Sequence, residues 1–502
     1  MIGHEVIIIG SHPIANDLIR QYEANGYTVK HQGELKAEGI CINDYDELFV
    51  LTNGNEDDRA VALLGQLACA YDVEAHGNVR LKCHVLLQSI QTLRMLQTCD
   101  LCDAVRLKID VYPFSTDEMW CRSIVLDYQP ITIQSDKHVH LIIMGMNEIG
   151  EMVAIHAAHV AHYPNYVRNH SIRTRITLID AEAERKYEDL IKRYQHLFDN
   201  CYYRVVKPKE EKAVVKFHKP MYENRREDFV DVEWEFVETE PWNVDLREKL
   251  QLWAADEKQL MTVVMVDKDG DKNVNEALHL PENLYRHQIP IYIYNQHQGM
   301  TSSLSYACPN IRCFGMIDNG YDVTLPLVRM AKNVNYIYDR CYEDNDSAWS
   351  GMLRYAVEID QEERERSWAR LSNIKRMSSI YNAMNIASKM RSIGLEKDEW
   401  DKFYDITQQD IELLAQVEHN RWSVEVLILG FRPCTEEEQK RIETDIHLKK
   451  EYKNKKIHYD LRAYNDLRPD ETGKPVAAYD LCLCSCLPLI AKAAADEEGG
   501  EA

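Results

Sequence analysis

The stretch HVHLIIMGMNEIGEMVAIHAAHVAHY, residues 138–163, followed by RTRITLID at 173–180, decides the fold. Val139 to Met144 is an apolar run typical of a strand buried on both faces. A turn bounded by two glycines then leads into a helical stretch, and a second β-branched run ends in an acid, Asp180. Strand, glycine turn, helix, strand and acid, in that order, are the parts of a dinucleotide-binding βαβ unit.

Each part of this unit has a chemical role in binding a nucleotide. Glycines let the backbone approach a pyrophosphate, the helix N-terminus attracts that anion, and the acid accepts hydrogen bonds from ribose hydroxyls. The pattern departs from the usual one because Asn147 replaces the middle glycine and the acid lies farther along the chain. We predict that NAD or another adenine nucleotide binds at Gly145, Asn147, Glu148, Ile149, Gly150 and Asp180.

The bulk composition is that of a soluble globular protein with several domains, which we expect to be cytoplasmic. The 502 residues carry a net charge of -23, which argues against a nucleic-acid or anionic-membrane surface, since both need a basic face. No apolar run reaches the ~20 residues of a membrane span, so no direct membrane insertion is expected. The N-terminus enters a strand directly and does not resemble a signal peptide. We therefore expect the 14 cysteines to be reduced.

The strand-turn-helix pattern occurs twice, which predicts an α/β fold with two Rossmann-like domains. Residues 1–132 form the first copy, which is degenerate because its turn keeps one glycine, Gly10, and its second strand ends in His31 in place of an acid. We expect this copy to bind a dinucleotide poorly. Residues 138–340 form the better-preserved copy, in which residues 207–245 are predicted to be an irregular insert.

From about residue 345 the pattern becomes helical, and residues 490–502 are predicted to be a disordered tail. The strongest signature here is VEHNRW at 417–422, continued by LGFRP at 429–433 and HYDL at 458–461. Read from its spacing alone, this helix has a tryptophan core and a salt-bridged surface of Glu418, Arg421 and Glu425.

Residues 350–480 resemble the bacterial form of the ryanodine-receptor-type (RyR) domain, on the strength of these motifs. The two preceding domains resemble the TrkA-N, or RCK-type, nucleotide-binding domains that regulate potassium transport. The combined resemblance implies a ligand sensor, with an RyR-type helical domain that recognises a second ligand or partner. On that resemblance the ligand-binding residues of the RyR-type domain are His419, Asn420, Arg421, Trp422 and Tyr464.

Four other patterns resemble metal sites but fit them poorly, and no metal is predicted. Residues 267–273 have the acids of a calcium loop, but Lys272 replaces the required glycine, so we expect a strand-to-helix connection whose acids cap the helix. His156, His159 and His162 would fan too widely over a helix and are expected to be buried against the sheet. Cys99 and Cys102 lack a second pair, and the default for Cys482, Cys484 and Cys486 is a free-thiol core.

Together with the family resemblance, these patterns predict a ligand-sensing regulatory protein, expected to be a homodimer, in which the second Rossmann-like domain binds a small-molecule nucleotide ligand. No convincing catalytic set is present, since no nucleophile elbow, phosphate-loop lysine or zinc-protease motif occurs. Three alternatives stay open. The chain could be a regulatory subunit with a membrane transporter as its partner, an NAD-dependent oxidoreductase in which Asp180 favours NAD over NADP, or a nucleotide-switched defence effector.

Overall fold

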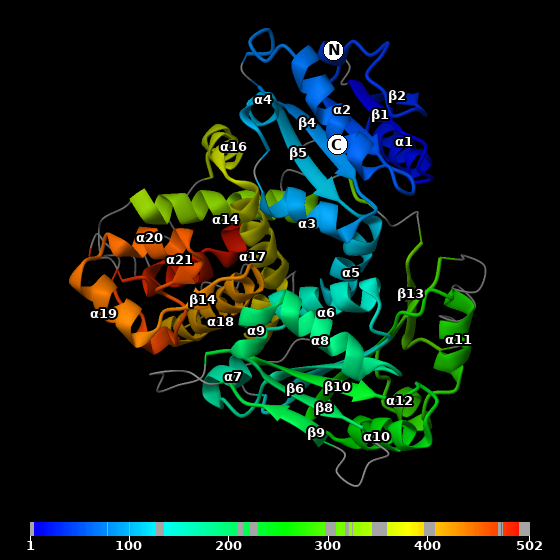
Figure 1. The fold of residues 1–502 in the computed structure, drawn as a ribbon, viewed down its shortest axis with the longest axis vertical. Helices are drawn as coiled ribbons and strands as arrows, with labels where there is room; N and C mark the ends of the chain where they lie inside the picture. The colour runs from blue at the N-terminus through cyan, green and yellow to red at the C-terminus, as the bar shows by residue number, and fades with distance from the viewer. Residues whose placement is uncertain are drawn as a thin grey trace. The chain divides into compact units, whose positions relative to one another are not determined.

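The computed structural model of this chain divides into two compact units (Figure 1). The first holds residues 1–122, 315–325 and 366–377, and the second holds 123–314, 326–365 and 378–502. Most of the predicted 138–340 and 350–480 domains thus falls in the second unit. The structure describes residues 5–490 except 78, 100, 127–134, 208–213, 221–228, 297–307, 317–320, 324, 344–358, 396–406, 470–472 and 474.

The first unit is built on a five-stranded parallel sheet with the strand order β2-β1-β3-β4-β5. Its strands are β1 (Glu5–Ile9), β2 (Thr28–Gln32), β3 (Glu47–Leu51), β4 (Leu81–Leu86) and β5 (Ile109–Phe114). Its helices are α1 (Ala15–Ala24), α2 (Asp57–Ala70), α3 (Ile90–Thr98) and α4 (Asp103–Arg106), with a short 3-10 turn at Ile42–Asp44 and with α5 (Thr116–Leu126) leading out of the unit. The Rossmann-like prediction for this region is confirmed, and β5 is a strand that the prediction lacked.

The second unit contains an eight-stranded sheet with the order β13-β12-β11-β6-β7-β10-β8-β9. Its strands are β6 (His138–Met144), β7 (Thr174–Asp180), β8 (Tyr202–Val206), β9 (Val214–His218), β10 (Val232–Glu238), β11 (Gln259–Met265), β12 (Ile291–Tyr294) and β13 (Ile311–Phe314). From β13 to β10 all pairings are parallel, and the order is that of a doubly wound dinucleotide-binding sheet. β8 continues this parallel arrangement, and β9 is antiparallel to β8.

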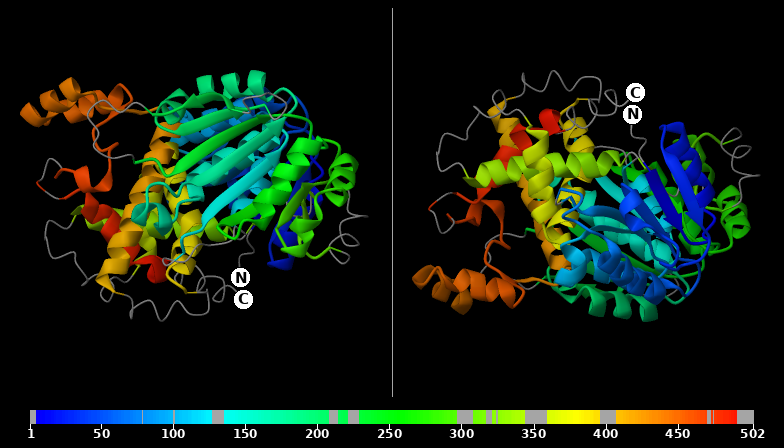
Figure 2. Two further views of the ribbon diagram at one scale, coloured as in Figure 1. Left: turned by 90° about the horizontal axis from the view of Figure 1, so that it is seen from below. Right: turned by 90° about the horizontal axis from the view of Figure 1, so that it is seen from above.

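Helices cover both faces of this second sheet, as Figures 1 and 2 show. They are α6 (Glu148–Val160), α7 (Pro164–Arg168), α8 (Ala183–Arg193), α9 (Gln195–Asp199), α10 (Val244–Ala255), α11 (Gly270–Leu278) and α12 (Glu282–Arg286). Successive side chains of β10 point to opposite faces of the sheet and so contact different helices. Phe236 lies against Tyr187 of α8, with ring centroids 5.4 Å apart, whereas Val237 belongs to the core that contains Leu246 and Leu250 of α10.

The predicted irregular insert at 207–245 is wrong, because β9 and β10 lie within it and β10 is inserted between β7 and β8. The segment is rich in Lys, Glu and aromatic residues, and this composition masked the strand VEWEFVE. In the structure Glu235 is buried, and its carboxylate accepts hydrogen bonds from Lys249 at 3.0 Å and Arg204 at 3.1 Å. Burial raises the pKa of Glu235, but the attraction of these cations outweighs burial and lowers it to about 2. A central strand can thus carry a buried charge.

The C-terminal region is mainly helical, as predicted. Its helices are α14 (Pro326–Glu343), α16 (Gln361–Arg370), α17 (Asn373–Ser392), α18 (Gln408–Ile428), α19 (Glu436–Thr444), α20 (Leu448–Asn454) and α21 (Ala477–Ser485), with two-residue strands β14 (Arg432–Pro433) and β15 (Ile457–His458) and a 3-10 turn at Tyr464–Asp466. The predicted disordered tail lies, apart from Ile490, outside the described residues. Among the helices that the structure describes, none has the length and hydropathy needed to cross a bilayer.

The prediction that all cysteines are reduced is wrong for one pair. Cys341 of α14 and Cys482 of α21 form a disulfide across a sequence separation of 141 residues. Cys482 was expected to belong to a free-thiol core together with Cys484 and Cys486, which are buried. Pairing depends on which helices pack together, and cysteine spacing alone does not reveal that when the two residues lie so far apart.

Candidate functional site

The turn after β6 lies where the strand order of the second sheet reverses, since β6 pairs with β7 on one side and β11 on the other. In doubly wound sheets ligands bind outside the carboxyl ends of the strands at this point. Gly145 has φ +117°, which L side chains rarely adopt, and its amide donates to the Ile179 carbonyl at 2.9 Å. The turn is thereby fixed to the end of β7.

Gly150 lets α6 begin directly against this turn. A Cβ atom at Gly150 would lie 2.1 Å from the carbonyl oxygen of Gly145 and 3.1 Å from a methyl carbon of Val266. Since real contacts of a Cβ atom are not that short, a side chain here would push the helix away from the turn. Gly150 therefore has the packing role of the last glycine in the dinucleotide-binding turn.

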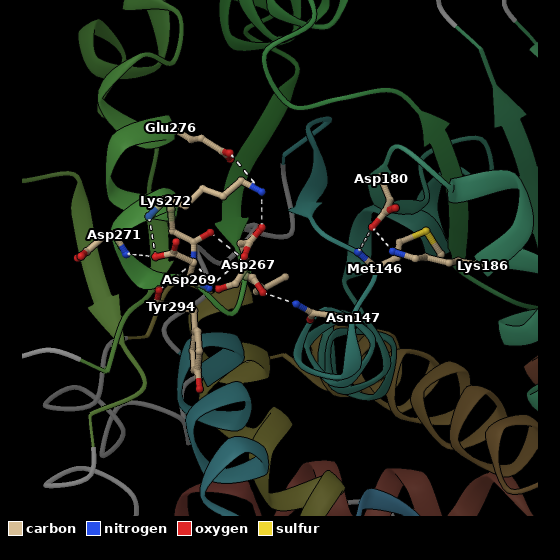
Figure 3. A network of polar contacts seen from close by, with 12 residues as sticks. Met146, Asn147, Asp180, Lys186, Asp267, Asp269, Asp271, Lys272, Glu276 and Tyr294 are labelled. Carbon is tan, nitrogen blue, oxygen red and sulfur yellow. Dashed lines mark hydrogen bonds and ion pairs between the residues drawn. The ribbon is translucent and has the colours of Figure 1, made fainter.

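Asn147 provides the cap of α6 at the position where the usual pattern has its middle glycine. Its side-chain oxygen accepts a hydrogen bond from the Gly150 amide at 3.0 Å. Its side-chain nitrogen donates to the Val266 carbonyl after β11 (Figure 3). Glu148 and Ile149 follow in the first turn of α6, where Glu148 is exposed and Ile149 buried. The structure thus brings the predicted residues of 145–150 together in one compact turn.

Asp180, at the end of β7, is joined to the same turn. One carboxylate oxygen accepts from the Met146 amide at 2.9 Å and from Lys186 Nζ at 2.7 Å (Figure 3). The other oxygen accepts from the Glu182 amide at 2.9 Å. Burial raises the pKa of Asp180, but these hydrogen bonds outweigh burial and hold the pKa below its ordinary value. Asp180 is therefore ionised at neutral pH and partly engaged by the protein itself.

A pocket of about 130 Å³ lies beside this acid, between α6 and α8. Its lining consists of Met146, Glu151, Leu178, Lys186, Asp189, Leu190 and Arg193. The lining combines an apolar part with two cations, Lys186 and Arg193, of which Arg193 forms an ion pair with Glu151. The sequence prediction missed these residues. The sequence signal that could have indicated them is the position of Lys186 in the first turns of α8, the helix that follows Asp180.

On the other side of the turn, the end of β11 leads into α11 as predicted for residues 267–273. The side chain of Asp269 caps α11, accepting from the amides of Asp271 at 3.1 Å and Lys272 at 3.2 Å. Lys272 also pairs with Asp267 (Figure 3). Asp267 and Asp269 are therefore engaged by residues in the first turn of α11. Among the residues that the structure describes, no group of three or more His, Cys, Asp or Glu side chains could hold a metal ion.

In the first sheet, the turn after β1 has no acid at the position that corresponds to Asp180. Gly10 has φ +124°, and a Cβ atom there would lie 2.0 Å from the Leu51 carbonyl oxygen. The strand β2 ends at Gln32, one residue beyond the predicted His31, and the Gly10 amide donates to the Gln32 carbonyl as the Gly145 amide does to the Ile179 carbonyl. The residue that corresponds to Asp180 is therefore Gly33, which has no side chain to bind a ribose. His31 lies two residues earlier and donates from Nε2 to the Gly10 carbonyl at 2.8 Å.

The signature helix α18 carries a buried ion-pair cluster, not the predicted salt-bridged surface. Arg421 pairs with Glu418 at 2.8 Å and Glu425 at 2.6 Å, and Lys389 of α17 pairs with Glu418. All four side chains are at most 3% exposed. The spacing correctly indicated that Glu418, Arg421 and Glu425 share one face of α18. Spacing does not reveal, however, that α17 covers that face. Asn382 of α17 adds a hydrogen bond to Glu418 at 2.7 Å.

Aromatic rings gather on the other side of α18. The ring of His419 lies 5.5 Å from Trp422 and 5.8 Å from Tyr464, and Trp422 lies 4.9 Å from His458. His419 donates from Nε2 to the Arg462 carbonyl at 2.8 Å. Trp422 is only partly buried, whereas His419, Asn420 and Arg421 are fully buried. Of the predicted residues, Trp422 and Tyr464 are thus the more accessible to a ligand.

The histidines of α6 and its exit are buried, as expected from the sequence. His159 stacks on Tyr381 of α17, with ring centroids 3.7 Å apart. His162 hydrogen-bonds to Asp231 at 2.7 Å and to the Ala158 carbonyl at 2.8 Å. Asn385 of α17 donates to the Val160 carbonyl, the last residue of α6, at 2.7 Å. The helix that begins at the glycine turn therefore ends against the C-terminal helices.

No protein-family model matches this chain, and no curated protein matches its sequence. Among solved structures, the chain is similar to one of the subunits of dipicolinate synthase from Bacillus halodurans, with 10% sequence identity and a TM-score of 0.21. That match covers 62% of this chain and 90% of the other. The Rossmann-like description of both sheets rests on their own strand orders, and the resemblance to TrkA-N and RyR domains stays a prediction.

Proposed function

We propose that this protein is a regulatory sensor that binds an adenine nucleotide at the turn between β6 and α6. The observation that carries the proposal is the convergence of three features at the switch point of the second sheet. These are the Gly145 turn, the start of α6 against it, and the ionised Asp180 hydrogen-bonded to the Met146 amide. The amides of the helix start suit a phosphate group, and Asp180 suits a ribose hydroxyl.

A regulatory role is supported by the path of α6. The helix starts at the proposed nucleotide site and ends where Asn385 bonds to the Val160 carbonyl and Tyr381 stacks on His159. A ligand that shifts the start of α6 would therefore act on the contacts of α17, provided that it binds two arrangements of α6 with different affinity. The aromatic rings around Trp422 are the proposed site for a second ligand or partner, in line with the RyR resemblance.

Native mass spectrometry of gently purified protein tests the nucleotide site. We expect a bound mass of nucleotide size, or one acquired on adding NAD⁺ or ATP, that is lost in Asp180→Ala. Asp199→Ala removes an exposed acid from the same unit and should leave binding intact. If neither nucleotide binds the wild-type protein, or if Asp180→Ala retains it fully, the proposal fails. The spectrum also reports whether the protein is the proposed homodimer.

A further inference from the structure

Asp180 has less free acceptor capacity than the acid of an ordinary NAD site. A carboxylate offers roughly four lone-pair positions. Met146, Lys186 and Glu182 occupy three of them. One position on the oxygen that faces Glu182 remains for a ligand, whereas an NAD site uses its acid to hold the ribose hydroxyls. The usual preference for an unsubstituted ribose is therefore weakened here.

Lys186 also changes the charge that a ligand meets. A bare carboxylate at this place repels a phosphate on the neighbouring ribose, but Lys186 lies 2.7 Å from Asp180 and compensates its charge. An ammonium group has three donors, so two remain after the bond to Asp180. Lys186 is 29% exposed and lines the pocket together with Arg193, which is 44% exposed.

The two other acids of the pocket, Glu151 and Asp189, do not make it repel a phosphate. Glu151 and Arg193 neutralise each other in their ion pair, and Glu151 also accepts from the Tyr194 hydroxyl. Arg193 uses Nη1 in this pair, so its other guanidinium donors remain for a phosphate. Asp189 is exposed on α8, so water and salt screen its charge. A ribose phosphate placed in the pocket would thus meet Lys186 and Arg193 as its nearest cations.

We propose, building on the nucleotide site proposed above, that the pocket beside Asp180 accepts adenine nucleotides that carry a 2′-phosphate on the ribose. Lys186 is the residue that determines this specificity, because it both cancels the charge of Asp180 and donates to the phosphate. Arg193 contributes a second donor from the next turns of α8. The pocket then distinguishes NADP-type nucleotides from NAD-type nucleotides by one phosphate group.

Isothermal titration calorimetry with NAD⁺ and NADP⁺ on the full chain tests this assignment. We expect wild-type protein to bind NADP⁺ at least as tightly as NAD⁺. Lys186→Ala should weaken NADP⁺ binding by about tenfold or more, the usual effect of losing a hydrogen bond between charged groups. NAD⁺ binding should be retained or become tighter, because the substitution frees Asp180 for the ribose hydroxyls. Retained NAD⁺ binding also shows that the variant is folded. Lys192→Ala, an exposed lysine on the same helix, is the matched control and should alter neither affinity.

The possible failures are distinguishable. Tight binding of NAD⁺ with exclusion of NADP⁺ would overturn the 2′-phosphate assignment and leave the proposed nucleotide site standing. Equal loss of NADP⁺ binding in Lys186→Ala and Lys192→Ala would show a general charge effect and overturn the role of Lys186. Absence of binding for both nucleotides would overturn the site and its specificity together.

Discussion

Replacing Glu418 by Gln should destabilise the second unit strongly at neutral pH, because Glu418 is the shared anion of Arg421 and Lys389. Burial raises the pKa of Glu418, but attraction to these two cations outweighs burial and lowers the pKa from 4.5 to about 2. At 1.36 kcal/mol per pKa unit, the ionised carboxylate stabilises the folded state by about 3 kcal/mol at pH 7. Removing one member of a buried ion pair costs a similar amount, about 3–5 kcal/mol.

The pH dependence gives this prediction a second, independent readout. The folded-state pKa is depressed, so the stabilisation is fully present above the unfolded-state value near 4.5 and is lost as pH falls from there toward 2. Between pH 7 and pH 4 the difference in unfolding free energy between wild type and Glu418→Gln should narrow by about 0.8 kcal/mol.

Urea unfolding followed by circular dichroism at pH 7, 5 and 4 measures both quantities. Glu412→Gln changes an exposed glutamate of the same helix and is the matched control, with an expected effect within about 0.5 kcal/mol. If the two variants have the same unfolding free energy at pH 7, Glu418 is not the buried, doubly paired anion described above, and the reasoning is refuted.

Two further predictions concern backbone packing and cross-linking. Gly150→Ala should lower stability by about 1–3 kcal/mol in thermal unfolding, because its Cβ would lie 2.1 Å from a backbone oxygen. Gly65→Ala in α2, where a Cβ meets nothing within 4 Å, should be neutral or stabilising, and equal losses would contradict the packing argument. Non-reducing peptide mapping should recover Cys341 joined to Cys482, and Cys341→Ser should cost up to about 5 kcal/mol, the loop-closure estimate for a 141-residue separation. Recovery of both as thiols would rule out the cross-link.

The centre of the second sheet was predictable because each signal there is local. The apolar run of β6, the glycines of the turn and the acid that ends β7 lie within one stretch of sequence, and the structure brings Asp180 to that turn. The caps of α6 and α11 follow from Asn147 and Asp269 in the same way.

The remaining features depend on partners that are distant in sequence. Glu235 resembles a loop residue until Lys249 and Arg204 are placed beside it. Arg421 resembles a surface residue until α17 supplies Lys389 to the same cluster. The Cys341–Cys482 bond depends on the packing of two helices. In each case the missing information was the tertiary neighbour.

The position of β10 has a consequence for how the chain acquires its fold. β8 and β9 precede β10 in the sequence, but in the sheet β10 separates them from β7. Until β10 has been synthesised, the outer edge of β7 is unpaired, and β8 is a ready parallel partner for it. We therefore expect a transient β7–β8 pairing in the nascent chain that has to dissociate before β10 can pair with both strands. On this side of β6 the sheet is completed by insertion of an internal strand, whereas β11, β12 and β13 are added afterwards by growth at the opposite edge.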